Sequence, residues 1–422
     1  MRLPARNRLA SGAALLRSLS FDERMAGGLM VLFAVVPPSA ARLFGDYALL
    51  LAERAAILAI AALSLELLVG VGGLLSFGHA AFLGIGAYAA GVLASHGLGT
   101  MSLALPAALL ASAAFALLTG AVAVRTRGVH FIMITLAFGQ MAFFIAASLA
   151  PYGGDDGLSF PSRTLVVGRR LLQHEAAFYY VTLATLALAY IAADRLVGSR
   201  FGRVLRGLTE DELRMQAIGF APYRYRLTLY VIAGTLCGLA GFLLGNQAEF
   251  VSPAYMHWQR SGELILMLLL GGTGTLYGPI VGAVAYLALE EALSRLTEHW
   301  KVILGPSLIL LVLFAEGGVA GAIDAYRRGH FTRRPPRALL RDGLAAGAAW
   351  RARSRDAIAA LRPRLDPLLC RFARQPPRAL LRQGLASGAA LLAHCRDAIG
   401  VKVTVARSRI ALLFASDRWR RK

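Results

Sequence analysis

Charged residues are scarce in this sequence of 422 residues. Asp, Glu, Lys and Arg together make up 16% of the chain, hydrophobic residues make up 57%, and the mean hydropathy is +0.58. Soluble globular domains carry about 25% charged residues. Many apolar runs reach the ~20 residues that a helix needs to cross ~30 Å of hydrocarbon. We therefore expect an integral membrane protein rather than a soluble enzyme.

Cysteine and the common catalytic motifs are also scarce. Cys237, Cys370 and Cys395 are the only cysteines; they show no metal-ligand spacing, and nothing in the sequence indicates a disulfide framework. The glycine-rich stretch GGTGTLYGP at residues 271–279 lacks the Lys-Ser/Thr pair of a phosphate-binding loop. We predict no catalytic residue, no metal and no cofactor in this chain, and we expect these glycines to break or pack helices.

Ten apolar runs predict an all-α fold, a polytopic transmembrane helical bundle of about 8–10 spans. The first run contains Pro37 and Pro38, which should kink or split a helix. The eighth and ninth are separated by glycines and predict a broken or re-entrant helix pair, whose backbone must be satisfied by protein or water. The runs lie near residues 25–44, 55–73, 77–95, 98–124, 129–150, 176–193, 227–247, 262–276, 277–293 and 301–320.

Positive charge is concentrated in the C-terminal part of the chain. Residues 321–422 hold 23 Lys and Arg against 6 Asp and Glu, whereas residues 1–320 hold 22 against 18. A nucleic-acid-binding role for the whole protein is therefore not indicated. The tail repeats an RALLR-type segment with a period of 41 residues. Two copies are too few for a solenoid, so we expect a partly helical or disordered tail, with membrane lipid as a possible contact.

Arginine placement predicts the orientation. The N-terminal arginines precede an apolar run, as in a signal peptide, but the many later spans favour an uncleaved first span. With the N-terminus in the cytoplasm, the inner side carries 14 basic residues against 8 outside, before the tail is counted. We expect three parts: a cytoplasmic basic N-terminus (1–24), a transmembrane domain (25–320) that contains the charged connection at 194–226, and the basic tail (321–422). Both termini should then be cytoplasmic.

The connection at residues 194–226 is charged and can form a short helix. Thr209 is a plausible N-cap, acidic residues would follow in the first turn, where the helix dipole favours them, and Gly219 would end the helix. A membrane subunit without its own ATPase needs such a rigid element to receive force, although an ordinary solvated loop helix has the same pattern. The predicted coupling residues are Glu210, Asp211, Glu212, Met215, Ala217 and Gly219.

Polar residues inside apolar runs are costly in lipid and usually face a bundle interior or a water-filled path. Each can form an interhelical hydrogen bond, lie at the interface or line a solute path, and the sequence leaves these open. Glu66 is the sharpest case because an acid lies within an apolar stretch. The candidates are Glu66, Ser76, His79, Thr135, Gln140, Asn246, Gln247, Glu249 and Glu263, with Gly271, Gly272 and Gly274 as helix-packing or path positions.

Four segments resemble a known family. They are LSLELLVGVGGLLSFGHAAFLGIGAYAA (63–90), RGVHFIMITLAFGQM (127–141), GGDDGLS (153–159), and the run from SRFGRVLRGLTEDELRMQAIG through LLLGGTGTLYGPIVGA. In combination the segments, spread over residues 26–321, resemble the permease subunits of branched-chain amino acid ABC importers, specifically the M-type of the two paired permeases.

The resemblance implies partners and a role. A member of this family pairs with a second permease subunit and two cytosolic ATPase subunits, which bind the ATP, and an extracytoplasmic solute-binding protein delivers the solute. The segment matching 210–219 would be the element that docks on the ATPases. The expected location is the bacterial cytoplasmic (inner) membrane.

Several features depart from the family pattern. Glu66 stands where Asn is expected, Ala315 stands where Pro is expected, and the repeated tail has no counterpart. Urea or another small solute therefore stays open as the cargo. An ion-coupled secondary carrier is the alternative of a different class; it should show coupling-ion residues in broken helices at mid-membrane. A membrane anchor that uses the basic tail is a third.

Overall fold

A computed structural model describes residues 21–44, 47–160, 163–165 and 171–295, with isolated positions at 299, 304, 305, 318 and 321. All of them belong to the first of two units, Met1–Phe331; the second unit is Thr332–Lys422. Most of the predicted N-terminal segment, nearly all of the last predicted span at 301–320, and the repeated tail lie outside the described residues.

Helices dominate the described residues, which confirms the all-α class. The two strands, β1 (Leu158–Ser159) and β2 (Phe250–Val251), form a two-residue antiparallel pair. The longer helices are α2 (Phe21–Phe44), α3 (Tyr47–Glu66), α4 (His79–Ser95), α5 (Met101–Ala123), α6 (Val129–Ser148), α7 (Glu175–Gly198), α8 (Arg200–Glu210), α10 (Pro222–Ala248), α11 (Trp258–Gly271) and α12 (Gly278–Ser294). The shorter ones are the π-helix η1 (Leu67–Val71), the 3-10 helices η2 (Ala150–Tyr152), η3 (Leu171–Gln173) and η4 (Pro253–Met256), and α9 (Glu212–Ala217).

Five stretches of the described chain are long and apolar enough to cross a membrane: α3 with η1, α5, α6, α7 and α10. At 17, 14 and 17 residues, α4, α11 and α12 fall short of the ~20 that a crossing needs. The predicted break between the eighth and ninth runs is confirmed at residues 272–277. Of the kink or split expected at Pro37–Pro38, the split does not occur, since α2 is one helix of 24 residues.

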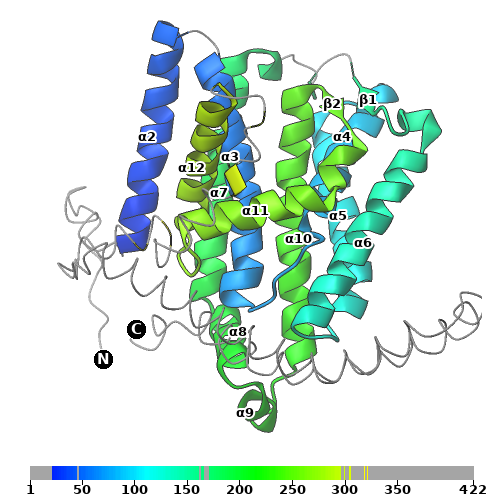
Figure 1. The fold of residues 1–422 in the computed structure, drawn as a ribbon, viewed down its shortest axis with the longest axis vertical. Coiled ribbons are helices and arrows are strands. Elements are labelled where there is room, and N and C mark those ends of the chain that lie inside the picture. Colours follow the sequence, from blue (N-terminus) through cyan, green and yellow to red (C-terminus); the bar gives the residue numbers. More distant parts are fainter. Residues whose placement is uncertain are drawn as a thin grey trace, which may run out of the picture. The chain divides into compact units, whose positions relative to one another are not determined.

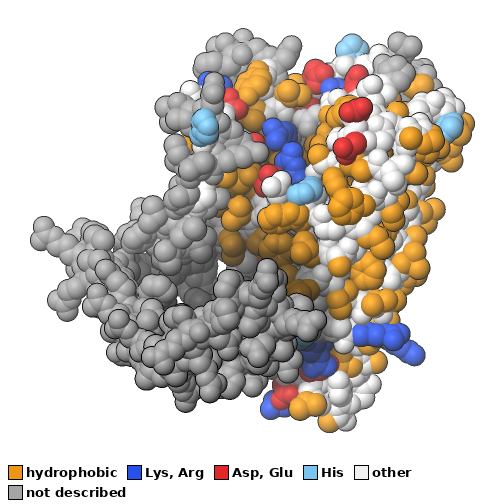
Figure 2. Space-filling model, turned by 45° about the vertical axis from the view of Figure 1, so that its right-hand side comes forward, with side chains coloured by type: hydrophobic (Ala, Val, Ile, Leu, Met, Phe, Trp, Pro, Cys, Tyr) orange, Lys and Arg blue, Asp and Glu red, His pale blue; other side chains and the backbone are white. Residues whose placement is uncertain are grey.

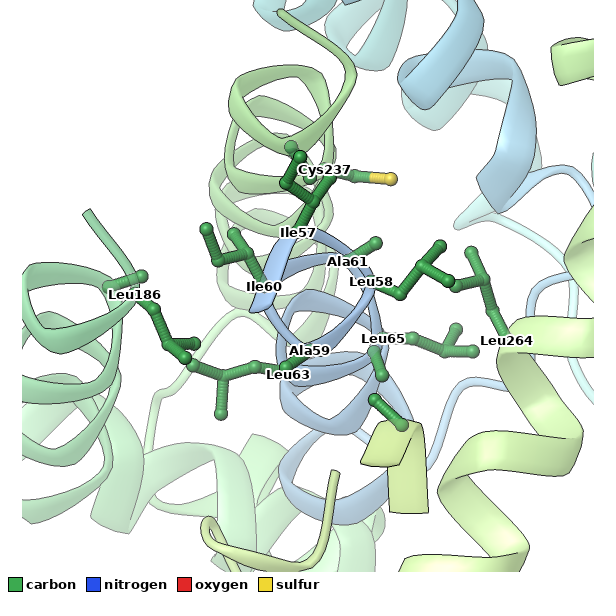
Figure 3. Packing of buried hydrophobic residues seen from close by; sticks show 14 of the residues in the cluster. Ile57, Leu58, Ala59, Ile60, Ala61, Leu63, Leu65, Leu186, Cys237 and Leu264 are labelled. Carbon is green, nitrogen blue, oxygen red and sulfur yellow. The ribbon is translucent and has the colours of Figure 1, made fainter. Parts of the chain in front are cut away.

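Helix α3 is the centre of the bundle. Its apolar residues point in every direction, toward α7, α10 and α11, as Figure 3 shows for Ile60, Leu63 and Leu65. Buried residues make up 83% of its most apolar window, compared with 22% for α5 and 28% for α6. The α5 and α6 helices are about as apolar as α3, so α3 differs from them in being surrounded by the other helices rather than in its hydropathy.

Glycines set the spacing between α10 and α4. A Cβ at Gly86 would lie 2.0 Å from the carbonyl oxygen of Gly238, and one at Gly241 would lie 1.8 Å from that of Leu83. The backbones of the two helices are therefore in direct contact, which only small residues permit. This contact explains the small-residue run at 77–91 in the sequence.

The bundle has two different ends. Figure 1 shows α8 and α9 at one end and the β1–β2 pair at the other, with α11 lying crosswise to α3 and α10 between them. In Figure 2 charged side chains gather toward these two ends, and apolar side chains cover much of the described surface between them. This banded surface is what a chain embedded in lipid requires.

Candidate functional site

The first candidate region lies inside the bundle between η1 and α4. We call residues 72–78 and the start of α4 the central break. The chain leaves η1, passes through residues 72–78 without helical structure and starts α4 at His79, which is fully buried. His79 Nε2 lies 2.7 Å from Ser64 Oγ of α3, and the Ala80 amide donates to Ser261 Oγ of α11 at 3.0 Å. The break thus joins α3, α4 and α11 through neutral hydrogen bonds.

Helix α6 closes one side of the central break. Thr135 Oγ1 accepts a hydrogen bond from the Phe77 amide at 3.3 Å, and a Cβ at Gly78 would lie 2.0 Å from the Thr135 carbonyl oxygen. Ser76 is fully buried in the same segment. Gln140 lies farther along α6, half-buried, and its Nε2 is buried without a hydrogen-bond partner among the described residues. Ser76, His79 and Thr135 therefore lie together, and Gln140 follows Gly139, where a Cβ would lie 3.1 Å from Gly78 Cα.

The glycines of GGTGTLYGP form the turn between α11 and α12. Gly272 and Gly274 have φ angles of 101° and 90°, which L side chains rarely adopt. A Cβ at Gly271 would lie 1.9 Å from the Gly278 carbonyl oxygen. Glu66 joins this turn to α3, because its Oε1 accepts the Gly274 amide at 2.7 Å. These glycines therefore break and pack helices, as predicted.

A cavity near the β1–β2 end carries charges of both signs. It encloses about 380 Å³ and is lined by residues that include Asp155, His257, Arg260 and Glu263. Arg260 Nη1 lies 2.6 Å from Glu263 Oε2. Such a lining can contact both charged ends of a zwitterion. Asp155, His257 and Arg260 were missed as site residues, since residues about 100 positions apart along the chain meet only after folding.

Arg163 was also missed as a site residue. Its side chain is buried, donates to Glu175 Oε1 at 2.8 Å and to the Leu172 carbonyl oxygen at 3.1 Å, and lies over the Phe178 ring. It ties the segment at 163–165 to the start of α7. No motif in the sequence marks Arg163 as a residue with this role.

The second candidate region, the α8–α9 end, is the helix pair between α7 and α10. Ser199 caps α8 by accepting the Gly202 amide, and Asp211 caps α9 by accepting the Arg214 amide at 3.1 Å. The predicted N-cap at Thr209 is therefore wrong. Thr209 lies inside α8, where its hydroxyl donates to the Arg206 carbonyl oxygen, because the chain starts the helix ten residues earlier at Ser199.

The other predicted coupling residues all lie at this end. Glu210 is the last residue of α8, and Ala217 is the exposed last residue of α9. Gly219 follows α9 and has a φ of 100°. Met215 packs back onto α8, where its Sδ would lie 2.9 Å from a Cβ at Gly207. The six residues are thus contiguous in space.

Glu212 anchors this helix pair to the bundle. Its Oε2 lies 2.9 Å from Arg226 Nη1 of α10, and its Oε1 pairs with Arg127 from the start of α6. Leu213 and Ile218 point the other way and are 79% and 67% exposed. A firmly held helix that presents apolar side chains at a charged end of the molecule is suited to docking on another protein.

Comparison with known proteins covers most of the described chain. Residues 47–314 match the family model described as the branched-chain amino acid transport system / permease component. No solved structure matches.

Individual relatives agree with the family match. The high-affinity branched-chain amino acid transport system permease protein LivM of Salmonella typhimurium is 28% identical over 293 residues, covering 64% of this chain and 69% of the relative. LivM of Escherichia coli is 28% identical over 284 residues, covering 62% and 67%. LivH of Escherichia coli is 30% identical over 151 residues, covering 35% and 47%. The chain belongs to the family of permease components of branched-chain amino acid transport systems.

Proposed function

We propose that this chain is a membrane permease subunit of an ATP-driven importer. Together with a second permease subunit it would form the path for branched-chain or related hydrophobic amino acids. Two cytosolic ATPase subunits would bind the ATP, so the chain needs no cofactor of its own, and an extracytoplasmic solute-binding protein would deliver the solute. Family membership and the names of the relatives support this proposal.

The observation that carries the proposal is the α8–α9 end. Leu213 and Ile218 are the exposed apolar side chains of this end, and the Glu212 ion pairs hold the helix that carries them. When a partner covers apolar side chains that are exposed on a rigid, charged surface, their removal from water favours binding. A subunit that must receive force from an ATPase requires such a contact.

This assignment sets the orientation. The α8–α9 end would face the cytoplasm, in keeping with the arginines near it, and both chain termini would lie on the same side. The β1–β2 end, with its mixed-charge cavity, would then face outward in a bacterial cytoplasmic membrane. The solute path would run beside the central break, where polar groups of α3, α4, α6 and α11 gather.

The test removes the exposed apolar pair. In Leu213→Gln/Ile218→Gln we expect co-purification of the ATPase subunits and ATP-dependent leucine uptake to fall on the order of tenfold, because the variant loses the apolar surface that the partner would bury. Leu98→Gln is the matched control: Leu98 is 51% exposed and precedes α5 at the opposite end. Normal co-purification and uptake in the double variant would overturn the proposal. Uptake of urea but not leucine would change the cargo and leave the permease role intact.

A further inference from the structure

Glu66 is a buried acid at the end of the central helix. It is the last residue of α3, only 2% exposed, and it stands between the apolar Leu65 and Leu67. Its Oε1 accepts the Gly274 amide at 2.7 Å across 208 residues of chain. Nothing in the coupling or transport roles discussed so far explains why an acid is placed here.

The space for this carboxylate is made by a glycine. A Cβ at Gly70, one turn further on in η1, would lie 2.1 Å from Glu66 Oε1. A π-helix such as η1 is rare and often marks a functional site. Glu66 and Gly70 therefore form one arrangement: the acid occupies the volume that the glycine leaves empty.

The amide that donates to Glu66 is that of Gly274, and it lies outside the hydrogen-bond ladders of the two neighbouring helices. Gly274 lies in the turn between α11 and α12, at a φ of 90° that suits glycine. Neither helix supplies a partner for this amide, because α11 ends at Gly271 and α12 begins only at Gly278. Glu66 thus satisfies the irregular backbone of the broken pair.

The same segment continues to the α8–α9 end. After η1 the chain passes through Gly72 and Gly73, and a Cβ at Gly73 would lie 3.2 Å from Thr209 Cγ2 in α8. A Cβ at Gly72 would lie 2.5 Å from the Leu229 side chain of α10. A continuous line of close contacts therefore runs from α8 through η1 to Glu66 and the α11–α12 turn.

We infer that Glu66 is a positioning residue that fastens the α11–α12 turn to η1, so that a displacement of α8 moves the broken helix pair. The part of Glu66 that does this is a carbonyl-type acceptor at Oε1, and its charge is dispensable. The contact itself is independent of the proposed function; its consequence for transport rests on the proposed coupling role of α8.

The test separates the acceptor from the charge. Glu66→Gln keeps an oxygen at the Oε1 position, whereas Glu66→Leu removes it. We expect amide hydrogen exchange of residues 272–277 in the purified full chain to be unchanged in Glu66→Gln and faster by about tenfold or more in Glu66→Leu. Leucine uptake by the complex reconstituted with its partners should follow the same order.

Gly70→Ala tests the arrangement from the other side. The new Cβ would displace the carboxylate, so amide hydrogen exchange at 272–277 should accelerate as in Glu66→Leu. The double variant Glu66→Leu/Gly70→Ala should exchange no faster than either single variant, because both substitutions break the same contact. Gly262→Ala is the control, since a Cβ at Gly262 in α11 meets nothing within 4 Å. Unchanged exchange in α5 and α6 shows that each variant is folded.

The outcomes distinguish the two proposals. If amide hydrogen exchange of residues 272–277 is as fast in Glu66→Gln as in Glu66→Leu, the acceptor role is overturned. Normal exchange but lost uptake in Glu66→Gln would also overturn it, since the charge would then act on a solute or an ion. If Glu66→Leu accelerates exchange while the unmodified complex imports no leucine with ATP, the contact stands and the importer function fails.

Discussion

The central break and the α8–α9 end satisfy their polar groups in opposite ways. In the central break the partners are neutral hydroxyl, imidazole and amide groups, and backbones approach so closely that glycine is required at Gly78. At the α8–α9 end the partners are full charges, Glu212 with Arg226 and Arg127, and apolar side chains face outward.

This difference reflects the surroundings of each region. Inside an apolar bundle a full charge is expensive, so polar groups are matched by hydrogen bonds over short distances and shape complementarity is strict. At the end of the bundle water stabilises charges, ion pairs are less demanding in geometry, and the surface is free to bind a partner. The first region should therefore tolerate added volume poorly, and the folding stability of the second should respond mainly to lost charge.

The largest expected effect is added volume in the central break. In Gly78→Ala the new Cβ would lie 2.0 Å from the Thr135 carbonyl oxygen, a backbone atom that cannot rotate away. We expect a destabilisation of about 3 kcal/mol, seen as a lower thermal midpoint of the detergent-solubilised protein. Gly198→Ala in α7, where a Cβ meets nothing within 4 Å, is the control. Equal midpoints for the two variants would show that the regions do not differ as described.

An intermediate effect is expected at the Glu212 anchor. The Arg226 side chain is 12% exposed and that of Arg127 is 65% exposed, although both pair with the same carboxylate. Arg226→Gln should destabilise the helix pair by about 1–3 kcal/mol, because Glu212 loses its buried partner. Arg127→Gln should cost less than about 1 kcal/mol. Proteolysis within residues 199–221 measures both, and a larger effect for Arg127→Gln would contradict this ranking.

The smallest effect concerns the cap of α9. Asp211→Ala removes the acceptor of the Arg214 amide and should cost about 1 kcal/mol of local stability. Thr209→Ala should change it by less than about 0.5 kcal/mol, since a hydroxyl that bonds back to its own helix contributes little. Hydrogen exchange of residues 212–218 compares the two. A larger change in Thr209→Ala would restore Thr209 as the cap.

Most of the fold could be predicted from the sequence because apolar run length and glycine placement act locally. The runs near 129–150 and 227–247 became α6 and α10 with ends shifted by a few residues, and the glycines at 271–274 became a break between helices. Thr209 was misassigned because several residues in this loop have good capping side chains, and the choice of Asp211 depends on where α8 ends. Asp155, Arg260 and Arg163 could not be recognised, because their roles come from partners distant in sequence.

The sequence by itself determined a multi-helix membrane chain, its family and the presence of a charged connection between spans, since these follow from composition, run length and motif order. The tertiary structure alone decided which helix is central, that Glu66 meets Gly274, and that Glu212 joins α6 and α10. The reason is physical. Hydropathy measures the preference of a segment for lipid or interior, and it assigns the same preference to α3 and α6, whereas burial and pairing depend on which surfaces meet when the helices pack.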